Sequence, residues 1–365
     1  MVEIVVRVPE NTPPWQPVFL AGDGPELGDW APTGVPLAPW DDGTHRVWLD
    51  LPPGFRGRFL VTPGRWRGAE TDPRGHEHLP RELFGDGPQT VEIHVGGWGR
   101  TSVHYHPDAP SQFLPHRRTV SVWLPPGYDF QPDRRYPVFY MHDGQNLFDA
   151  HTAFAGNPWW ADEVAERAMR ADRVPPLIIV GVANTPDRLD EYGPRREPAD
   201  DRDPARNYGR MLVEEVKPFI DATYRTRLEP EHTGVGGSSM GGLISLHLCK
   251  WYPEVFGKCA ALSPSLWWDR EYFLRTASSG WTDRCRVWLD VGERESSNPA
   301  GSAATMARTR RLAGLFAWHG LRDGEHFRYV EVPGGEHNEW SWGGRFDRVL
   351  EFLFGEETHP PNLPP

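Results

Sequence analysis

A glycine- and serine-rich stretch at residues 236–242 constrains the fold of this chain more than any other feature. It runs Gly-Gly-Ser-Ser-Met-Gly-Gly and holds the spacing Gly-x-Ser-x-Gly, centred on Ser239. An apolar strand end, 233–235, precedes it, and an apolar helix start, 243–248, follows it. A serine with small neighbours between a strand and a helix is typical of a tight turn that exposes the hydroxyl group. The stretch therefore predicts a strand–turn–helix unit with Ser239 as a candidate nucleophile.

Length and charge limit the classes of protein to consider. A chain of 365 residues predicts two domains. An excess of 51 acidic over 39 basic side chains, a formal charge of −12, argues against nucleic acid or an anionic membrane as the main partner. The three cysteines (Cys249, Cys259 and Cys285) lack a C-x-x-C spacing. Free buried thiols are therefore expected, rather than a metal site or a disulfide framework.

The sequence offers no targeting or membrane signal. Residues 1–7 lack a basic region followed by a long apolar core. No segment reaches the roughly 18 apolar residues that a membrane span needs. These observations predict a cytoplasmic protein with no membrane partner.

The pattern of secondary structure changes near residue 100. Residues 1–100 contain short strand candidates separated by Pro/Gly turns and show no helical period, which predicts an immunoglobulin-like all-β sandwich. From 117 to 357 strands and helices alternate, which predicts an α/β domain with a parallel sheet covered on both faces. Segment 101–116, rich in Pro, His and Ser, is the expected linker, and the Pro-rich tail 358–365 is expected to be disordered. The clearest elements of the second half are strands at 118–124, 136–141, 177–183 and 286–291 and helices at 161–170, 205–224 and 304–318.

A nucleophilic serine needs a base. In folds that carry the serine on such a strand–turn–helix unit, the order along the chain is serine, then the acid, then the histidine base. The predicted strand 327–332 leads into a loop, 333–340, that contains His337. His337 is therefore the candidate base. His326 and His359 fit ordinary surface histidines better.

The acid should lie just after the strand that precedes the histidine strand. The loop after strand 287–291 offers Glu293 and Glu295. Glu295 has room to turn back toward the base and is the preferred candidate, with Glu293 as the alternative. Asp290 lies inside the strand and is less free to do so.

Two backbone amides are candidates for an oxyanion hole. One belongs to Met240, directly after the serine, and the other to Gln145, in the loop after strand 138–142. Gly144 allows the backbone to turn there. A metal site at His142 and Asp143 is the weaker interpretation, because nothing nearby completes a ligand set.

Several motifs of the second half resemble one known family. They are Tyr140 to Phe148, Gly236 to Gly242, Tyr252 to Gly257, Ser263 to Trp268 and Gly334 to His337. Together they resemble the esterase family that includes enterochelin (ferric siderophore) esterases, feruloyl esterases and mycolyltransferases. The resemblance covers roughly residues 117–355. It implies an α/β-hydrolase fold, a triad of Ser239, Glu295 and His337, an oxyanion hole at Gln145 and Met240, and no metal or other cofactor. Many members place Asp where Glu295 stands.

The first half is similar to starch- or glycogen-binding β-sandwiches. The similarity lies in 19–22, 27–30, 48–52 and Trp66 followed by Glu70. It implies that Trp30 and Trp66 stack on glucose rings beside a cation, here Arg58, so that a glucan is a second candidate partner. The alternative interpretation is that these tryptophans are structural core.

Three further residues are candidates for contact with a substrate. Arg188 could face an anionic or catecholate group, and Trp160 and Trp268 follow strands of the predicted sheet. A solvated arginine and core-packed tryptophans are the alternatives.

The residues and the resemblance together predict a serine carboxylic-ester hydrolase that acts on a small-molecule ester through an acyl-enzyme intermediate. Siderophore, aryl and acyl-sugar esters are the expected substrates. One alternative is an acyltransferase that passes the acyl group to a sugar or another alcohol. A second is a carbohydrate-binding protein in which the hydrolase domain serves as a scaffold, although an intact set of Ser, acid and His argues against it.

Overall fold

The computed structural model describes residues 1–10, 12, 16–66, 68–72, 78–98, 103–128, 131–195, 203–277 and 285–355. The predicted tail, 358–365, lies outside these residues. The chain divides into two compact units. Unit 1 draws on residues 1–102, 125–132 and 163–174, and unit 2 on residues 103–124, 133–162 and 175–365.

Unit 1 contains two four-stranded sheets with a shared apolar core. The first has the order β4 (Ala38–Pro39), β5 (Thr44–Leu49), β1 (Val2–Arg7), β9 (Gln89–His94), and the second β3 (Val35–Pro36), β2 (Phe19–Gly22), β6 (Arg56–Thr62), β8 (Arg81–Phe84). A short pair, β7 (Glu70–Thr71) and β10 (Gly97–Trp98), is separate. Alternate residues such as Ile4 on β1 and Leu20 on β2 meet in one buried cluster. The strands agree with the predicted all-β region, and its immunoglobulin-like character stays a prediction.

The tryptophans proposed to stack on sugar are buried in unit 1. Trp30 is 2 % exposed and Trp66 is 4 % exposed, and their ring centroids lie 6.1 Å apart. Both pack in a cluster with Leu60. The Arg58 guanidinium lies 5.9 Å from the centroid of the Trp30 ring and also donates to Asp23 at 3.0 Å. Of the two interpretations of these tryptophans, their burial favours structural core, because large apolar side chains contribute more to stability inside the core than on the surface.

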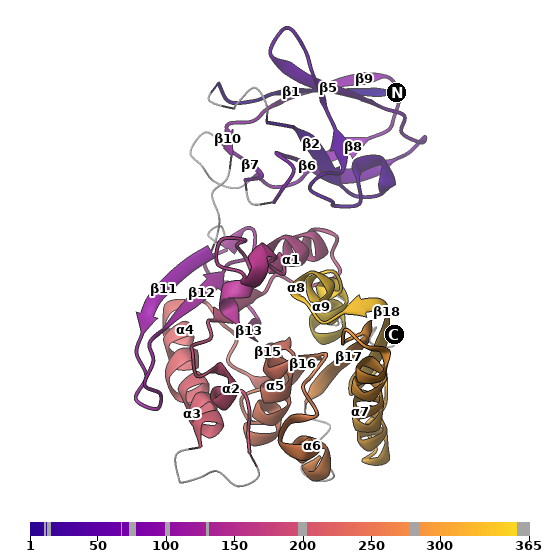
Figure 1. Cartoon of the computed structure of the whole chain (residues 1–365). Helices are drawn as coiled ribbons and strands as arrows, with labels where there is room; N and C mark the ends of the chain where they lie inside the picture. Colours follow the sequence, from indigo (N-terminus) through magenta and orange to yellow (C-terminus); the bar gives the residue numbers. More distant parts are fainter. Residues whose placement is uncertain are drawn as a thin grey trace, which may run out of the picture. The chain divides into compact units, whose positions relative to one another are not determined.

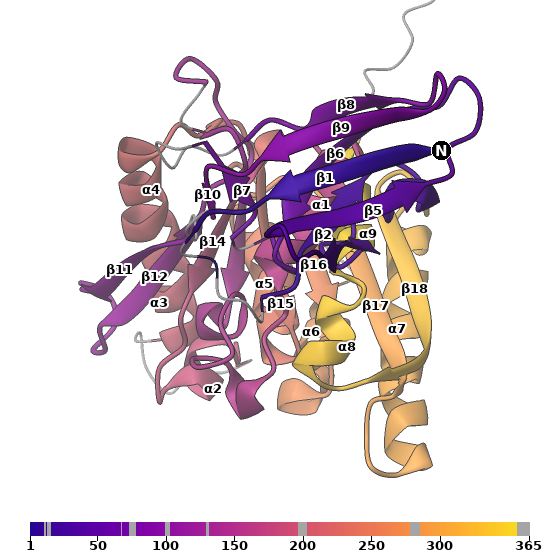
Figure 2. The same ribbon diagram turned by 90° about the horizontal axis from the view of Figure 1, so that it is seen from above.

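Unit 2 is organised around an eight-stranded sheet (Figures 1 and 2). The strand order is β11 (Val103–Ala109), β12 (Arg118–Trp123), β14 (Ile178–Val182), β13 (Val138–His142), β15 (Thr233–Ser238), β16 (Lys258–Leu262), β17 (Arg286–Arg294), β18 (Phe327–Glu336). The strands from β14 to β18 are parallel, and β12 is antiparallel to both of its neighbours. The unit therefore has an α/β-hydrolase type of fold, as predicted.

Strand β11, Val103–Ala109, lies inside the segment 101–116 that was predicted to be a linker, so the linker prediction was wrong for these residues. The strand forms the outer edge of the sheet and pairs with β12 from Val103 to Ala109, with a register shift after His106. Pro107 falls inside this shift. An edge strand with an irregularity tolerates proline, because no hydrogen bond from that residue is required.

Helices cover both faces of the sheet. On one face, Phe346 and Phe354 of α9 pack on Phe139 of β13. On the other, Phe316 of α7 packs on Phe327 of β18. The helices that the structure describes in unit 2 are α2 (Arg188–Glu191), α3 (Pro204–Arg210), α4 (Lys217–Thr223), α5 (Met240–Trp251), α6 (Trp268–Thr276), α7 (Pro299–Trp318), α8 (Glu339–Gly343) and α9 (Phe346–Phe354). Helix α1 (Ala161–Arg170) belongs mostly to unit 1.

Two helices differ from their predicted extents for local reasons. The helix predicted at 205–224 is a continuous run in which a π-helical segment, Met211–Val216, joins α3 to α4. Helix α7 begins at Pro299, five residues before the predicted start at 304. Its N-cap is Asn298, whose side chain accepts a hydrogen bond from the Gly301 amide at 2.7 Å. None of the described helices is both long and apolar enough to cross a membrane.

Candidate active site

Ser239 lies on a strained turn between β15 and α5. Its backbone angles are φ 56° and ψ −119°, a region that non-glycine residues rarely adopt. The Ser239 amide donates to the Leu262 carbonyl at 2.9 Å, and the Ser265 amide donates to the Ser239 carbonyl at 3.0 Å. These two bonds, one to the last residue of β16 and one to the segment after it, hold the turn in place. Its hydroxyl group is thereby fixed at the carboxyl edge of the sheet.

The glycines around Ser239 are required by close packing. A Cβ atom on Gly237 would lie 3.2 Å from the Gly241 carbonyl carbon and from the Cβ of His142. A Cβ on Gly242 would lie 3.2 Å from the carbonyl oxygen of Leu262. Larger residues would push α5 away from the strands. The Gly-x-Ser-x-Gly spacing thus has the steric origin that the sequence indicated.

Ser239, His337 and Glu295 form a continuous line of contacts. The Oγ of Ser239 lies 2.9 Å from His337 Nε2, and His337 Nδ1 lies 2.5 Å from Glu295 Oε2. Each residue directly follows a parallel strand: β15, β18 and β17 respectively. Parallel strands bring their carboxyl ends to one edge of the sheet, where sites of α/β proteins lie. This topology explains how residues up to 98 positions apart in sequence come into contact.

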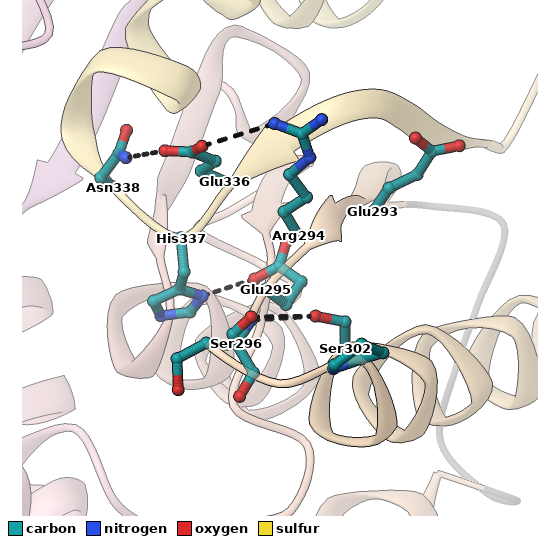
Figure 3. A pocket seen from close by; sticks show the side chains of 10 residues that line it. Glu293, Arg294, Glu295, Ser296, Ser302, Glu336, His337 and Asn338 are labelled. Atoms are coloured by element: carbon teal, nitrogen blue, oxygen red, sulfur yellow. Dashed lines mark hydrogen bonds and ion pairs between the residues drawn. The ribbon is translucent and has the colours of Figure 1, made fainter.

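Of the two candidate acids, only Glu295 contacts the imidazole (Figure 3). Its side chain is fully buried and also accepts hydrogen bonds from the Ser263 hydroxyl at 2.6 Å and from the Gly292 amide. Burial alone would raise the pKa of Glu295, but these hydrogen bonds and the one to His337 outweigh it and hold the pKa below its ordinary value. Glu293 is exposed, points away from His337, and accepts from the Gly334 amide at 2.8 Å.

A buried polar network stands behind Glu295. Arg345 makes two hydrogen bonds to the carboxylate of Asp290, at 2.9 and 2.8 Å. The same guanidinium donates to the Ser263 hydroxyl at 3.1 Å, as does the Trp342 indole N–H. Ser263 can therefore direct its own proton only toward Glu295. Asp290, considered as an acid from the sequence, serves here as the partner of Arg345.

The amides of Gln145 and Met240 both lie in first turns of helices. Met240 begins α5, and Gln145 lies in the 3₁₀ turn Gly144–Asn146 that follows β13. Amides at such positions have no partner within the helix and are available to a ligand. The loop approaches β14 so closely that a Cβ on Gly144 would lie 2.4 Å from the Gly181 carbonyl carbon. Glycine is thus needed to place the Gln145 amide.

A cavity of about 510 Å³, called here the acyl cavity, opens in front of Ser239. Its lining residues are Asp143, Gln145, Asn146, Thr152, Phe154, Asn184, Arg188, Ser238, Ser239, His337, Glu339 and Trp342. Arg188, a candidate for contact with a substrate, lines this cavity and also binds Asp143 through two hydrogen bonds of 2.7 Å. Burial alone would lower the pKa of Arg188, and the bonds to Asp143 raise it above its ordinary value, so the side chain stays charged.

Other predicted residues of this region have different surroundings. Trp160 and Trp268 are not among the residues that line the acyl cavity, so their contact with a substrate stays a prediction. Trp268 packs against Gly193 instead. His142 is buried, and this burial lowers its pKa to about 3, which keeps the imidazole neutral. Its Nδ1 lies 2.7 Å from the Tyr208 hydroxyl, consistent with a structural role rather than a metal ligand.

Sequence reasoning missed Asn146 and Glu339 in the acyl cavity and Ser263 behind it. The Nδ2 of Asn146 donates to Glu339 Oε1 at 3.1 Å. Burial raises the pKa of Glu339, and the nearby charge of Asp143 adds to this shift. Each of the three residues lies within four positions of a strand end at the sheet edge, the one signal by which they could have been found.

The fold and this site define an α/β-hydrolase with a Ser–His–Glu arrangement. The family model described as "Putative esterase" matches residues 111–353, so the chain belongs to that esterase family. The uncharacterised protein YbbA of Bacillus subtilis is 26 % identical over 247 residues, which are 66 % of this chain and 93 % of YbbA.

Two further comparisons concern proteins with named activities. The ferri-bacillibactin esterase BesA of Bacillus subtilis is 24 % identical over 176 residues, 43 % of this chain and 57 % of BesA. The match thus spans little more than half of that relative. The enterobactin esterase FES of Shigella flexneri has a similar structure, with a TM-score of 0.54 at 16 % identity over 92 % of this chain and 88 % of FES. At this identity the likeness concerns the fold alone.

Proposed function

We propose that the protein is a serine carboxylic-ester hydrolase that works through an acyl-enzyme intermediate. The observation that carries this proposal is the unbroken line of contacts from Glu295 through His337 to the Oγ of Ser239. A serine hydroxyl becomes nucleophilic when an adjacent base takes its proton and a buried acid holds that base in the right orientation.

The reaction follows from these positions. The Oγ of Ser239 attacks the ester carbonyl carbon while His337 Nε2 takes its proton. The negative oxygen of the tetrahedral intermediate accepts hydrogen bonds from the amides of Gln145 and Met240. His337 then protonates the alcohol oxygen, the ester C–O bond breaks, and the acyl group stays on Ser239. Water, activated by the same imidazole, attacks the acyl-enzyme and releases the acid.

Aryl and siderophore esters are the substrate classes we favour. BesA and FES carry the names of siderophore esterases. In this chain the acyl cavity holds the ring of Phe154, the guanidinium of Arg188 and the carboxylate of Glu339. A ring with hydroxyl groups, such as a catechol or a feruloyl group, finds both an apolar surface and hydrogen-bonding partners there. Acyl transfer to an alcohol is the alternative outcome for the same intermediate.

A panel of esters tests the function. With p-nitrophenyl acetate we expect a burst of p-nitrophenol that marks formation of the acyl-enzyme. In separate assays we expect steady hydrolysis of feruloyl or catecholate siderophore esters. Added alcohol separates the two outcomes, because a transferase would convert the acyl group into a new ester rather than the free acid. Absence of turnover on every ester of the panel would overturn the proposal.

For unit 1 we propose a scaffold role without glucan binding. The proposal rests on the burial of Trp30 and Trp66, which leaves neither ring face open to a sugar. Calorimetric titration of the full chain with maltoheptaose should show no saturable heat up to millimolar sugar. Saturable binding that is lost in Trp30→Ala would contradict the scaffold role.

A further inference from the structure

A second cavity borders the same imidazole from another direction. It has a volume of about 580 Å³ and includes Glu295 and His337 in its lining but not Ser239 or Gln145. The acyl cavity includes His337, Ser239 and Gln145. The two cavities therefore share the imidazole of His337. Of the other reacting groups, Glu295 lines the second cavity, and Ser239 and Gln145 line the acyl cavity.

The chemistry of the proposed function assigns a different part of an ester to each cavity. The carbonyl oxygen must face the amides of Gln145 and Met240, which places the acyl group on the Ser239 side. The alcohol oxygen must lie within hydrogen-bond distance of His337 Nε2, because that atom returns the proton. The alcohol part therefore leaves Ser239 in the direction of the imidazole, the one wall common to both cavities.

The second cavity is lined almost entirely by polar side chains. The lining residues besides Glu295 and His337 are Glu293, Arg294, Ser296, Ser297, Pro299, Ser302, Glu336 and Asn338 (Figure 3). Two exposed carboxylates, Glu293 and Glu336, and one guanidinium, Arg294, belong to this lining. Arg294 lies 3.9 Å from Glu336, and Glu293 accepts from the Gly334 amide instead. Within the described residues the hydroxyl group of Ser297 has no protein partner. Hydroxyl and amide groups of this kind bind hydroxyl groups. The two exposed carboxylates outnumber the one guanidinium, so the local charge disfavours an anion.

We propose that this second cavity, the alcohol cavity, binds the leaving-group half of the substrate, and that this half is a neutral alcohol with several hydroxyl groups. The inference rests on the proposed function and adds to it the chemical class of the alcohol. In the acyl-transfer alternative, the acceptor alcohol would enter the same cavity, since deacylation reverses the path of the leaving group.

A series of esters of one acid, benzoic acid, with different alcohols tests the assignment. The methyl ester is the reference, the glyceryl ester carries a neutral polyol, and the glycolate ester carries a carboxylate. We expect kcat/KM for the glyceryl ester to exceed that for the glycolate ester by about tenfold, and Glu336→Gln to reduce this preference by several fold.

Filling each cavity in turn provides the matched comparison. Ser297→Trp fills the alcohol cavity and should lower the ratio of glyceryl to methyl ester kcat/KM about tenfold. Thr152→Trp makes a similar small-to-large change in the acyl cavity, and it should alter preference among acids while leaving this alcohol ratio unaffected. Both esters are measured on the same variant, so a general loss of activity cancels in the ratio of their kcat/KM values. A thermal melt shows whether the variant is folded.

The outcomes distinguish the two proposals. Wild-type protein that hydrolyses neither the methyl nor p-nitrophenyl esters overturns both. Wild-type protein that hydrolyses these esters but treats glyceryl and glycolate esters alike, with a ratio unmoved by Ser297→Trp, overturns the alcohol cavity alone. A ratio changed equally by Ser297→Trp and Thr152→Trp also contradicts the assignment of separate cavities.

Discussion

Replacement of Ser239 by alanine is expected to remove nearly all esterase activity while the protein remains folded. The Oγ of Ser239 is the atom that would form the acyl-enzyme, and it is the hydroxyl that lies 2.9 Å from His337 Nε2. Loss of the nucleophile or base of such a unit lowers turnover by a factor on the order of 10⁴ to 10⁶. Turnover of p-nitrophenyl acetate and a thermal melt are the two measurements.

His337→Ala and the double variant are the companions of this experiment. Because nucleophile and base act as one unit, His337→Ala should be about as damaging as Ser239→Ala, and the double variant no worse than either. A Ser239→Ala protein that keeps a tenth of wild-type turnover would show that another group is the nucleophile.

Glu295→Gln is expected to lower turnover by a factor on the order of 10² to 10⁴, less than the loss in Ser239→Ala. The carboxylate accepts hydrogen bonds from three donors: His337, Ser263 and the Gly292 amide. An amide has only one acceptor oxygen, so its NH₂ group would face a donor. The imidazole would lose both its orientation and the charge that stabilises its protonated form. Steady-state kinetics on p-nitrophenyl acetate measures the loss.

Glu293→Gln is the matched control, since it makes the same chemical change two residues earlier. Glu293 accepts a hydrogen bond from the exposed Gly334 amide, a bond that an amide oxygen can keep, so the loss should be the smaller of the two. The reverse order of effects would move the acid to Glu293.

The difference in stability between the wild-type protein and Glu295→Gln should depend on pH in a defined direction. The pKa of Glu295 is lower in the folded than in the unfolded protein, so its ionised form stabilises the fold above the ordinary pKa of about 4.3. That contribution is lost as the pH falls through the folded pKa. The difference in melting temperature between wild type and Glu295→Gln should therefore shrink in acid.

Most of the reacting groups could be predicted because each depends on local sequence. The turn at Ser239 needs small residues within two positions of the serine, and His337 follows a recognisable strand. The order of the parallel strands then requires the two residues to meet at one edge. The choice of Glu295 over Glu293 was harder, because it depends on a hydrogen bond to Ser263, 32 residues away.

The features that escaped prediction depend on contacts between distant parts of the chain. Nothing near Arg345 in sequence indicates that it pairs with Asp290, 55 residues earlier. Strand β11 looked like a linker because Pro107 and neighbouring polar residues hide a pairing with β12. The position of Trp30 was left open between core and surface, since an aromatic residue after a turn can pack inward or face solvent. Contacts with Ala21 and Leu60 of the second sheet of unit 1 decide it.

The pair of Asp290 and Arg345 has a consequence for how this sequence can evolve. Their side chains are at most 5 % exposed, and removal of one partner would leave an unpaired charge in the core, at a cost of about 3–5 kcal/mol. A cost of this size is comparable to the whole stability of many domains. The two positions therefore cannot drift separately, and a lineage that loses one charge must lose the other in nearly the same step. Arg345 also donates to the Ser263 hydroxyl, which in turn donates to Glu295. A lineage that loses the charged pair would therefore also have to restore the position of Ser263 beside Glu295.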